Sequence, residues 1–149
     1  MAPYVLHKFD FQFIGYTPLM LAVSNFKSNE GLAYYFPGMN RNSEDDYLQC
    51  VKLLVKFNAD INWIDPHNGN SILQIAIVWQ KKTIAEFILN NLDVDIFHKN
   101  YFGMTAIDIC WFMKYDDMVK QIEKRVEELK EYDRFKEKGE EKGFFKKYY

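Results

Sequence analysis

Cysteine is scarce in this chain of 149 residues, which contains two. Cys50 and Cys110 stand singly, without the C-x-x-C spacing of a zinc ribbon or redox motif and without the density of a secreted disulfide scaffold. We therefore expect a reducing intracellular compartment, either the cytoplasm or an organelle such as the mitochondrion. Both thiols fall in apolar segments that are predicted below to be helical, and we expect them to be buried and inert.

The net charge is also small, and long apolar runs are lacking. The formal net charge is -2, so the chain has no overall basic field that would attract nucleic acid or an anionic membrane. No apolar run approaches the roughly 18 residues that a membrane span requires. We expect no nucleic-acid partner, and membrane association only through other proteins. The first ten residues contain one lysine and no arginine, and so resemble neither a secretory signal nor a transit peptide.

Groups that support catalysis are missing as well. A nucleophile needs a base within hydrogen-bond reach and a third group to orient that base. The sequence contains no such set, no phosphate-binding loop and no dinucleotide fingerprint. His67 and His98 fall in turns without a cysteine or carboxylate pair at ligand spacing. We therefore predict no catalytic, cofactor-binding or metal-binding residues.

Aromatic residues, in contrast, are abundant, because 13 Phe, 10 Tyr and 3 Trp make up 17% of the chain. This is more than a core of this size is expected to hide, which favours an interface where aromatic side chains are enriched. An AT-rich genome, which favours Asn, Lys, Ile, Phe and Tyr, explains the same composition. Composition alone leaves both explanations open.

A short motif recurs along the chain. The segment from Gly69 to Ala76 aligns without gaps on the segment from Gly103 to Cys110, which defines the period, and a third copy lies from Gly15 to Ala22. A second apolar segment follows each copy, beginning at Val51, Ala85 and Val119. In the first copy this second segment is delayed by about 20 residues, which predicts an insertion.

This pattern resembles the ankyrin repeat, whose signature is G-x-T-P-L-H-x-A, then V-x-L-L, then G-A-D-V-N. Asn58 to Asn62 and Val94 to Ile96 match the last element. The resemblance implies an all-α solenoid of three helix-turn-helix repeats with a C-terminal helical extension. The implied ankyrin-repeat domain is 1–125, with repeats at about 10–65, 66–99 and 100–125, an insertion at 24–46, and a charged helical extension and tail at 126–149.

The repeat register places helices, caps and turns. The predicted helical pairs are Thr17 to Asn25 with Asp45 to Phe57, Ser71 to Gln80 with Thr83 to Asn91, and Thr105 to Lys114 with a helix from Asp117 to near Lys138. Thr17, Ser71 and Thr105 are natural N-caps, because a side-chain oxygen there accepts from the first helical amides. Gly15 and Gly103 mark turns with positive φ.

The register also predicts the core. Near-complete burial is expected for Leu53, Leu73, Ala76, Ile88, Ile107 and Ile122. Along the extension, an apolar stripe formed by Val119, Ile122, Val126 and Leu129 predicts a helix that packs on its own domain, since two heptads are too few for a coiled coil.

Several positions depart from the family pattern. The family's histidine in T-P-L-H is replaced by Met20, Gln74 and Asp108, so the usual side-chain tie across each turn is made differently or lost. Asp108 is expected to bond to nearby backbone amides. Trp111 stands where the family has alanine and fits only if a neighbouring repeat is missing, so the last repeat is predicted to be irregular.

By resemblance, the concave surface of turn tips and first helices binds proteins. The predicted partner-binding residues are Trp79, Tyr101, Phe102, Met104, Met113 and His67, with Tyr34, Tyr35 and Phe36 of the insertion as secondary contacts. These insertion aromatics either pack on the first repeat or contact a partner. Two functions follow: an accessory structural subunit of a large intracellular assembly, which we favour at this point, or a free cytosolic adaptor or inhibitor with one client protein.

Overall fold

The computed structural model of the chain describes residues 15–24 and 44–137. In this part of the chain the secondary structure consists of six α-helices, without a strand. The helices are α2 (Pro18–Ser24), α4 (Glu44–Lys56), α5 (Ile72–Val78), α6 (Lys82–Asn91), α7 (Ala106–Phe112) and α8 (Asp116–Glu137). Each predicted helical end lies within two residues of an observed one. The prediction of an all-α solenoid with three helical pairs is confirmed.

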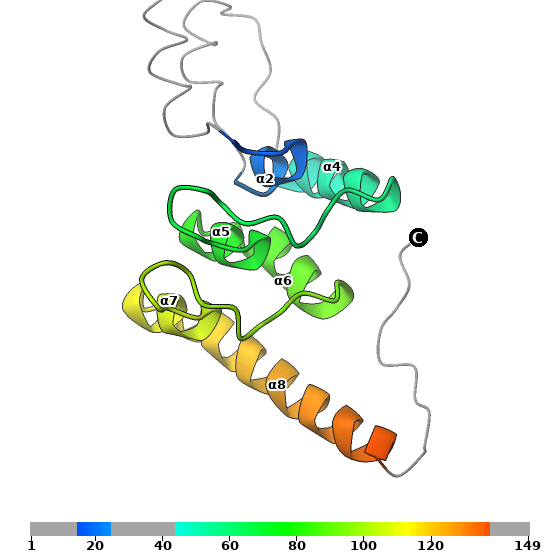
Figure 1. Ribbon diagram of the computed structural model, residues 1–149, viewed down its shortest axis with the longest axis vertical. Helices are drawn as coiled ribbons and strands as arrows, with labels where there is room; N and C mark the ends of the chain where they lie inside the picture. Colours follow the sequence, from blue (N-terminus) through cyan, green and yellow to red (C-terminus); the bar gives the residue numbers. More distant parts are fainter. Residues whose placement is uncertain (1–14, 25–43, 138–149) are drawn as a thin grey trace, which may run out of the picture.

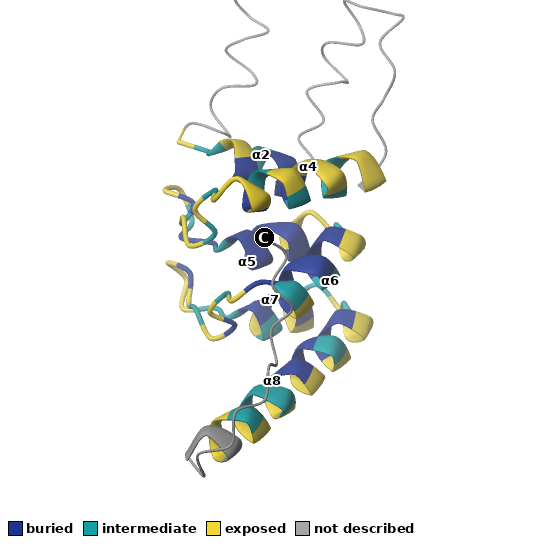
Figure 2. Ribbon diagram, turned by 90° about the vertical axis from the view of Figure 1, so that its right-hand side faces the viewer, coloured by how far each residue is buried: buried dark blue, intermediate teal, exposed yellow. Residues whose placement is uncertain are grey.

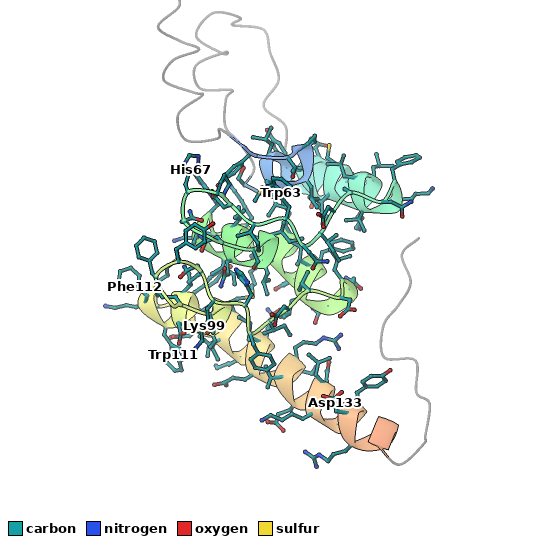
Figure 3. The ribbon with its side chains drawn as sticks, viewed as in Figure 1. Trp63, His67, Lys99, Trp111, Phe112 and Asp133 are labelled. Carbon is teal, nitrogen blue, oxygen red and sulfur yellow. The ribbon has the colours of Figure 1, made fainter. Side chains whose placement is uncertain are left out.

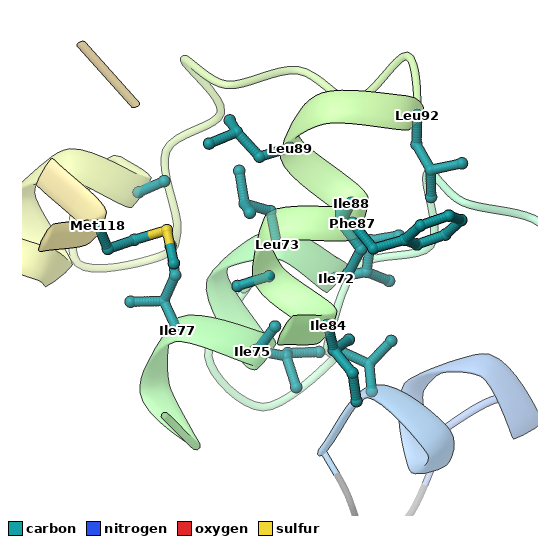
Figure 4. Packing of buried hydrophobic residues seen from close by; sticks show 14 of the residues in the cluster. Ile72, Leu73, Ile75, Ile77, Ile84, Phe87, Ile88, Leu89, Leu92 and Met118 are labelled. Atoms are coloured by element: carbon teal, nitrogen blue, oxygen red, sulfur yellow. The ribbon is translucent and has the colours of Figure 1, made fainter. Parts of the chain in front are cut away.

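The helices form two rows. α2, α5 and α7 lie side by side in one row, and α4, α6 and α8 lie in the other, while each helix also contacts its partner within the pair (Figure 1). The main contacts between helices therefore join neighbours in a row or partners in a pair. Buried residues are concentrated in the middle pair, α5 and α6 (Figure 2). Leu73 and Ile88 belong to this part of the core (Figure 4).

The first helix of each pair starts with the predicted cap. Thr17 Oγ1 accepts from the Met20 amide at 3.3 Å. Ser71 and Gln74 form a reciprocal capping box, in which the Gln74 amide donates to Ser71 Oγ at 3.3 Å and the Ser71 amide donates to Gln74 Oε1 at 2.9 Å. Such caps satisfy amides that have no partner within the helix. The hydroxyl side chain at the N-cap therefore determines where the first helix of each repeat begins.

Asp108 takes the same part in the third repeat. Its carboxylate accepts from the Thr105 amide at 2.9 Å, and its own amide donates to Thr105 Oγ1 at 3.4 Å. The expected bond to backbone is confirmed. Thr105 Oγ1 also donates to Asp108 Oδ2 at 2.9 Å. The two hydrogen bonds that Thr105 donates, the backbone one first, hold the pKa of the Asp108 carboxyl below its usual range.

Four of the six predicted core residues are fully buried, and two predictions are wrong. Leu53 is 53% exposed, whereas Phe87, its equivalent in the next repeat, is buried beneath Lys52, whose Nζ lies 5.5 Å from the Phe87 ring centre. Ile107 is only half-buried, whereas the equivalent Leu73 is fully buried. Both failures have one cause, because the first and last pairs each lack a stacked neighbour on one side within the part of the chain that the structure describes.

The two cysteines differ in burial, again because the first helical pair has a described neighbour on one side only. Cys110 is buried as predicted, and burial raises the pKa of its thiol to about 12. Cys50 is exposed, so its predicted burial is wrong. Its equivalent in the middle repeat is Ile84, which is fully buried because a helical pair lies on both sides of it.

The third repeat ends differently from the second. α8 has 22 residues and α6 has 10, so the predicted helical extension is confirmed. Val126 and Leu129 continue the predicted stripe and pack against the core. Trp111 is 59% exposed and lies on the side of α7 away from α5 (Figure 3). The tryptophan is accommodated because the described chain places no helix on that side.

Candidate functional site

Two turns of similar shape protrude where α5 and α7 begin. We call residues 65–70 and 99–104 the tips. The Asp65 amide donates to the Asn70 carbonyl at 2.9 Å, and the Asn100 amide donates to the Met104 carbonyl at 3.0 Å. Each tip contains a glycine at positive φ, as predicted for Gly103. The tips lie along one edge of the solenoid (Figure 1).

Side chains within the tips satisfy the tip amides. Asp65 Oδ1 accepts from the His67 amide, and Asn68 Oδ1 accepts from the Asn70 amide, both at 2.9 Å. Asn100 Oδ1 accepts from the amides of Phe102 and Met104, both at 3.0 Å. Turns are stabilised when a short polar side chain accepts a hydrogen bond from a backbone amide a few residues later in the chain. The tips are therefore fixed turns and present their larger side chains outward.

The two tips are also joined to one another. The Tyr101 amide donates to the Asn68 carbonyl at 2.9 Å, and Asn100 Nδ2 donates to Asn70 Oδ1 at 2.9 Å. His98 Nε2 lies 2.7 Å from the Gly69 carbonyl oxygen. Both asparagines of the side-chain pair are buried. The tips thus form one continuous surface whose backbone is held from behind.

Glycine at 69 permits this close approach. A Cβ atom on Gly69 would lie 2.5 Å from the Tyr101 ring, and φ at this residue is +74°. Only a residue without a side chain adopts this conformation freely and lets the ring pack against it. Tyr101 is therefore positioned by the preceding repeat.

Gln74 replaces the family histidine and makes the tie between turns in another way. Its Nε2 donates to the His98 carbonyl at 2.9 Å and to the Met104 carbonyl at 3.1 Å, while its Oε1 completes the cap of α5. The side chain is 1% exposed. Of the two sequence-based alternatives, a different tie or a lost one, the structure shows the first.

Gln74→Leu should lower the free energy of unfolding by at least about 2 kcal/mol. The change keeps the volume but removes the donor to the His98 carbonyl and the acceptor for the Ser71 amide, while the Met104 carbonyl keeps its bond from the Asn100 amide. Each buried polar group that loses its partner costs about 1 to 3 kcal/mol. Urea unfolding followed by circular dichroism measures the loss. Gln74→His, which restores the residue of the ankyrin signature, is the control. Its free energy of unfolding should fall by less than half as much as that of Gln74→Leu. Equal midpoints for Gln74→Leu and the unchanged protein would contradict the assigned tie.

A buried carboxylate ties the first repeat to the second. Asp65 is 1% exposed and accepts a hydrogen bond from the Tyr16 hydroxyl. Burial, and then the neighbouring Asp65 carboxylate, raise the pKa of the Tyr16 phenol well above its ordinary value. Sequence analysis missed Asp65, and its place at the start of a turn was the only signal for it. The residue is structural, because its carboxylate oxygens accept from the Tyr16 hydroxyl and the His67 amide.

Tyr16→Phe should lower the free energy of unfolding by about 1 to 3 kcal/mol, because it removes one hydroxyl and deprives a buried carboxylate of a donor. Tyr47→Phe, which removes a hydroxyl from a half-buried ring on α4, is the matched control and should change stability by less than about 0.5 kcal/mol, as surface changes usually do. Chemical unfolding of the two variants in parallel decides the point. Similar losses in both would show that the Tyr16 hydroxyl has no special role.

The structure brings four of the predicted partner-binding residues together on the tips. Tyr101 and Phe102 are 68% and 76% exposed. Met104 is half-buried against the core, and His67 is exposed on the preceding tip (Figure 3). Two exposed aromatic side chains beside a half-buried Met, on a fixed backbone, suit noncovalent binding of an apolar partner surface.

Trp79 and Met113 form a separate group. They are the C-cap residues of α5 and α7, so they lie at the far ends of these helices, about 10 Å along the axis from the tips. Trp79 is partly exposed and Met113 is half-buried. Tyr34, Tyr35 and Phe36 lie outside the described residues.

Four exposed apolar side chains that were not foreseen from the sequence form two pairs of equivalent positions. Val78 and Phe112 precede Trp79 and Met113, and Phe112 is 81% exposed. Phe97 and Trp63, the latter labelled in Figure 3, are exposed ahead of the tips. Val78 and Phe112 occupy equivalent positions in successive repeats, and so do Trp63 and Phe97. That shared register was the available signal, since a position that is exposed in one repeat tends to be exposed in the next.

Metal-binding clusters and membrane-spanning helices are both absent from the described residues. Across residues 15–24 and 44–137, His, Cys, Asp and Glu side chains nowhere gather in threes that could hold a metal ion. Over the same ranges, every helix is too short or too polar to cross a membrane.

Residues 39–128, more than half of the chain, match a family model described as ankyrin repeats in three copies. The chain is 29% identical over 72 residues to the I-Kappa-B like protein C1 of Microplitis demolitor bracovirus (isolate Webb), a match that covers 48% of this chain and 41% of that protein. It is 30% identical over 77 residues to the putative glutaminase 2 of Caenorhabditis elegans, covering 52% of this chain and 13% of that protein. The chain thus spans less than half the length of either relative.

Proposed function

Since the chain belongs to the ankyrin-repeat family, we propose that it is a non-catalytic interaction module that binds one client protein through the tips and the far ends of α5 and α7. Stacked repeats of this kind offer an extended concave surface for protein binding. The observation that supports this site most is the exposure of Tyr101 and Phe102 on a turn whose amides are already bonded.

The affinity of such a surface depends on how much of it is ordered before binding, as well as on the contacts that it makes. Binding requires that side chains and loops become ordered, and this cost is smaller where the backbone is held before the partner arrives. Aromatic side chains bury a large area with few rotatable bonds, which is why they dominate interface hot spots. Tyr101 has its ring against Gly69 and its amide bonded to Asn68, so it meets both conditions.

The free adaptor or inhibitor is our first candidate. One fixed surface with two adjacent exposed aromatics suits a single client. The relatives are named an I-Kappa-B like protein and a putative glutaminase, and neither name describes a subunit of a larger assembly. This reverses the order of the two functions that the sequence alone favoured.

An accessory subunit of a large assembly is the second candidate, favoured by apolar exposure elsewhere. Leu53 and Phe57 are 53% and 78% exposed on and just after α4, away from the tips. A subunit that is enclosed on several sides would cover such side chains, because large exposed apolar patches mark contact sites.

Site-specific photocrosslinking tests the proposal. A photoreactive amino acid is placed at Phe102, at Phe57 and, as a control, at the exposed Lys120 of α8, in the full chain made in its native cells. A single protein that crosslinks at position 102 alone supports the client-binding module. Different proteins captured at 102 and 57 support the assembly. No product at 102, or the same product at 102 and 120, contradicts the proposed surface.

A further inference from the structure

The open end of the third repeat retains a face that the middle repeat buries. Ile77 and Leu89 are fully buried in the middle repeat. At the equivalent positions of the third repeat, Trp111 is largely exposed and Glu123 is exposed. A carboxylate is costly to bury unless a cation or a hydrogen-bond donor satisfies it, so this face does not suit another ordinary repeat. It suits an occupant that carries positive charge opposite Glu123.

A groove of about 480 Å³ lies on this end face between α8 and the turn before α7. Its apolar lining includes Phe97, Ile107 and Val126. The second half of α8 continues beyond α7 (Figure 1), and within the described chain no helix lies on its outer side. The groove and the end of α8 therefore form one continuous open surface.

A stripe of four exposed charges runs along the side of α8 that borders the groove. It consists of Glu123, Glu127, Lys130 and Arg134, which are spaced by four, three and four residues and so lie on one side of the helix. Lys130 Nζ donates to Glu127 Oε1 at 2.9 Å. This hydrogen bond, then the charge of Lys130 and, to a smaller extent, that of Arg134, hold the pKa of the Glu127 carboxyl below its usual range. The stripe is therefore negative in its first half and positive in its second.

This charge pattern is self-complementary. When a second α8 lies antiparallel to the first, about an axis between residues 127 and 130, Glu123 meets Arg134 of the second copy and Glu127 meets Lys130 of the second copy. A two-fold interface requires such a pattern, because both copies use the same surface. The four charges nearest the axis then alternate in sign. Forming this network from two exposed intrahelical pairs sacrifices little, since an isolated exposed pair contributes little.

The same arrangement covers the apolar groove. Lysine and arginine have long aliphatic stems, which cover apolar surface while their charged ends remain at the edge. Lys130 and Arg134 of the second copy would lie across the groove beside Ile107. Trp111, one turn further along α7, offers an exposed ring on which a guanidinium stacks favourably. Apolar contact and charge pairing thus select the same occupant.

We propose that two copies of this chain associate through their open end faces, with the two α8 helices antiparallel about a two-fold axis between residues 127 and 130. The second half of each α8 occupies the groove of the other copy. The tips lie on a different edge of the solenoid (Figure 1), so the dimer would present two client surfaces and bind a client with two matching sites more tightly than one copy does. Because the tips lie outside the contact, the association is tested without any client.

Charge reversal in the full chain tests this pairing. Glu123→Lys and Arg134→Glu should each raise the dimer dissociation constant at least about fivefold, because each places two like-charge contacts in a two-fold dimer. Both changes in one chain restore opposite charges at both contacts, and the constant should return to within about twofold of that of the unchanged protein. Within one helix the two residues are about 16 Å apart along the axis, which exceeds the screening length of about 8 Å at physiological salt. Their compensation therefore requires a second copy.

Glu131→Lys and Lys124→Glu are the matched controls. They make the same changes of charge at exposed positions of α8 outside the stripe, and each should alter the constant by less than about twofold. Circular dichroism verifies the helical content of every variant. If a reversal lowers it, Glu123→Gln and Arg134→Gln take its place, and their combined effect should be smaller than the product of the single effects.

Sedimentation equilibrium over a range of concentrations, at about 0.15 M salt, measures the dissociation constants. Weakening by both single reversals, recovery in the double variant and silent controls support the antiparallel dimer. A chain that stays monomeric up to about 0.5 mM would overturn the proposal, and so would a dimer that resists both reversals or is weakened equally by the controls. Independent effects of the two reversals would overturn the pairing of residues 123 and 134. Polymers larger than a dimer would overturn it in favour of end-to-end stacking of repeats.

Discussion

Replacing Tyr101 and Phe102 together by alanine should weaken client binding by at least about thirtyfold and leave the helical content unchanged. Truncating a central aromatic anchor in a desolvated interface typically costs about 2 kcal/mol or more, which corresponds to that factor. Both side chains are more exposed than buried, so the core does not depend on them. Calorimetric titration of the crosslinked client, once identified, with the variant and the unchanged protein measures the loss.

Phe57→Ala is the matched control for this double change. Phe57 is 78% exposed just after α4, and its truncation should alter affinity by less than about threefold, as for most residues outside a hot spot. If the client remains bound after the double change at the tips but dissociates when residues 134–149 are removed, the tips are not the site. The tail would then be the attachment point.

Leu73→Ala should lower the free energy of unfolding by about 2 to 5 kcal/mol. The side chain is fully buried in the middle repeat, and its truncation removes apolar contacts and leaves a cavity. The loss is large against the roughly 5 to 15 kcal/mol that stabilise a typical domain. The midpoint of urea unfolding should therefore fall markedly.

The same substitution at the first repeat provides the control. Leu53→Ala removes the same atoms from a side chain that is 53% exposed, so it should cost less than about 1 kcal/mol. Similar losses at the two positions would mean that the middle repeat is not the centre of the core. An unchanged midpoint for Leu73→Ala would contradict the repeat register itself.

Helix positions were predictable because their signals are local. A hydroxyl at Ser71 or Thr105 caps the next turn whatever the neighbours are, and the period then places the remaining helices. Burial was less predictable because it depends on what lies beside a residue. A period assigns the same surroundings to Leu53 and Phe87, or to Ile107 and Leu73, and the assignment fails where the stack ends.

The tip side chains followed from the register, but the contacts that fix the tips did not. Asn70 and Asn100 bond to one another across 30 residues, and Tyr16 reaches Asp65 across 49. No local sequence pattern predicts hydrogen bonds between residues so far apart in the chain. Gln74 was identified only as a departure from the family, and its two bonds to the following turn required the fold to be known.

In the tips, the residues that hold the backbone differ from those that face outward, and this affects how such a protein diversifies. Asn70, Asn100 and Gln74 hold the tip backbone from the inside, whereas the side chains at 101 and 102 point outward from it. Substitutions at the outer positions leave every supporting bond in place. A lineage of such chains can therefore change its targets through a few exposed positions while keeping one architecture, and a designer can transplant new recognition residues onto the same frame.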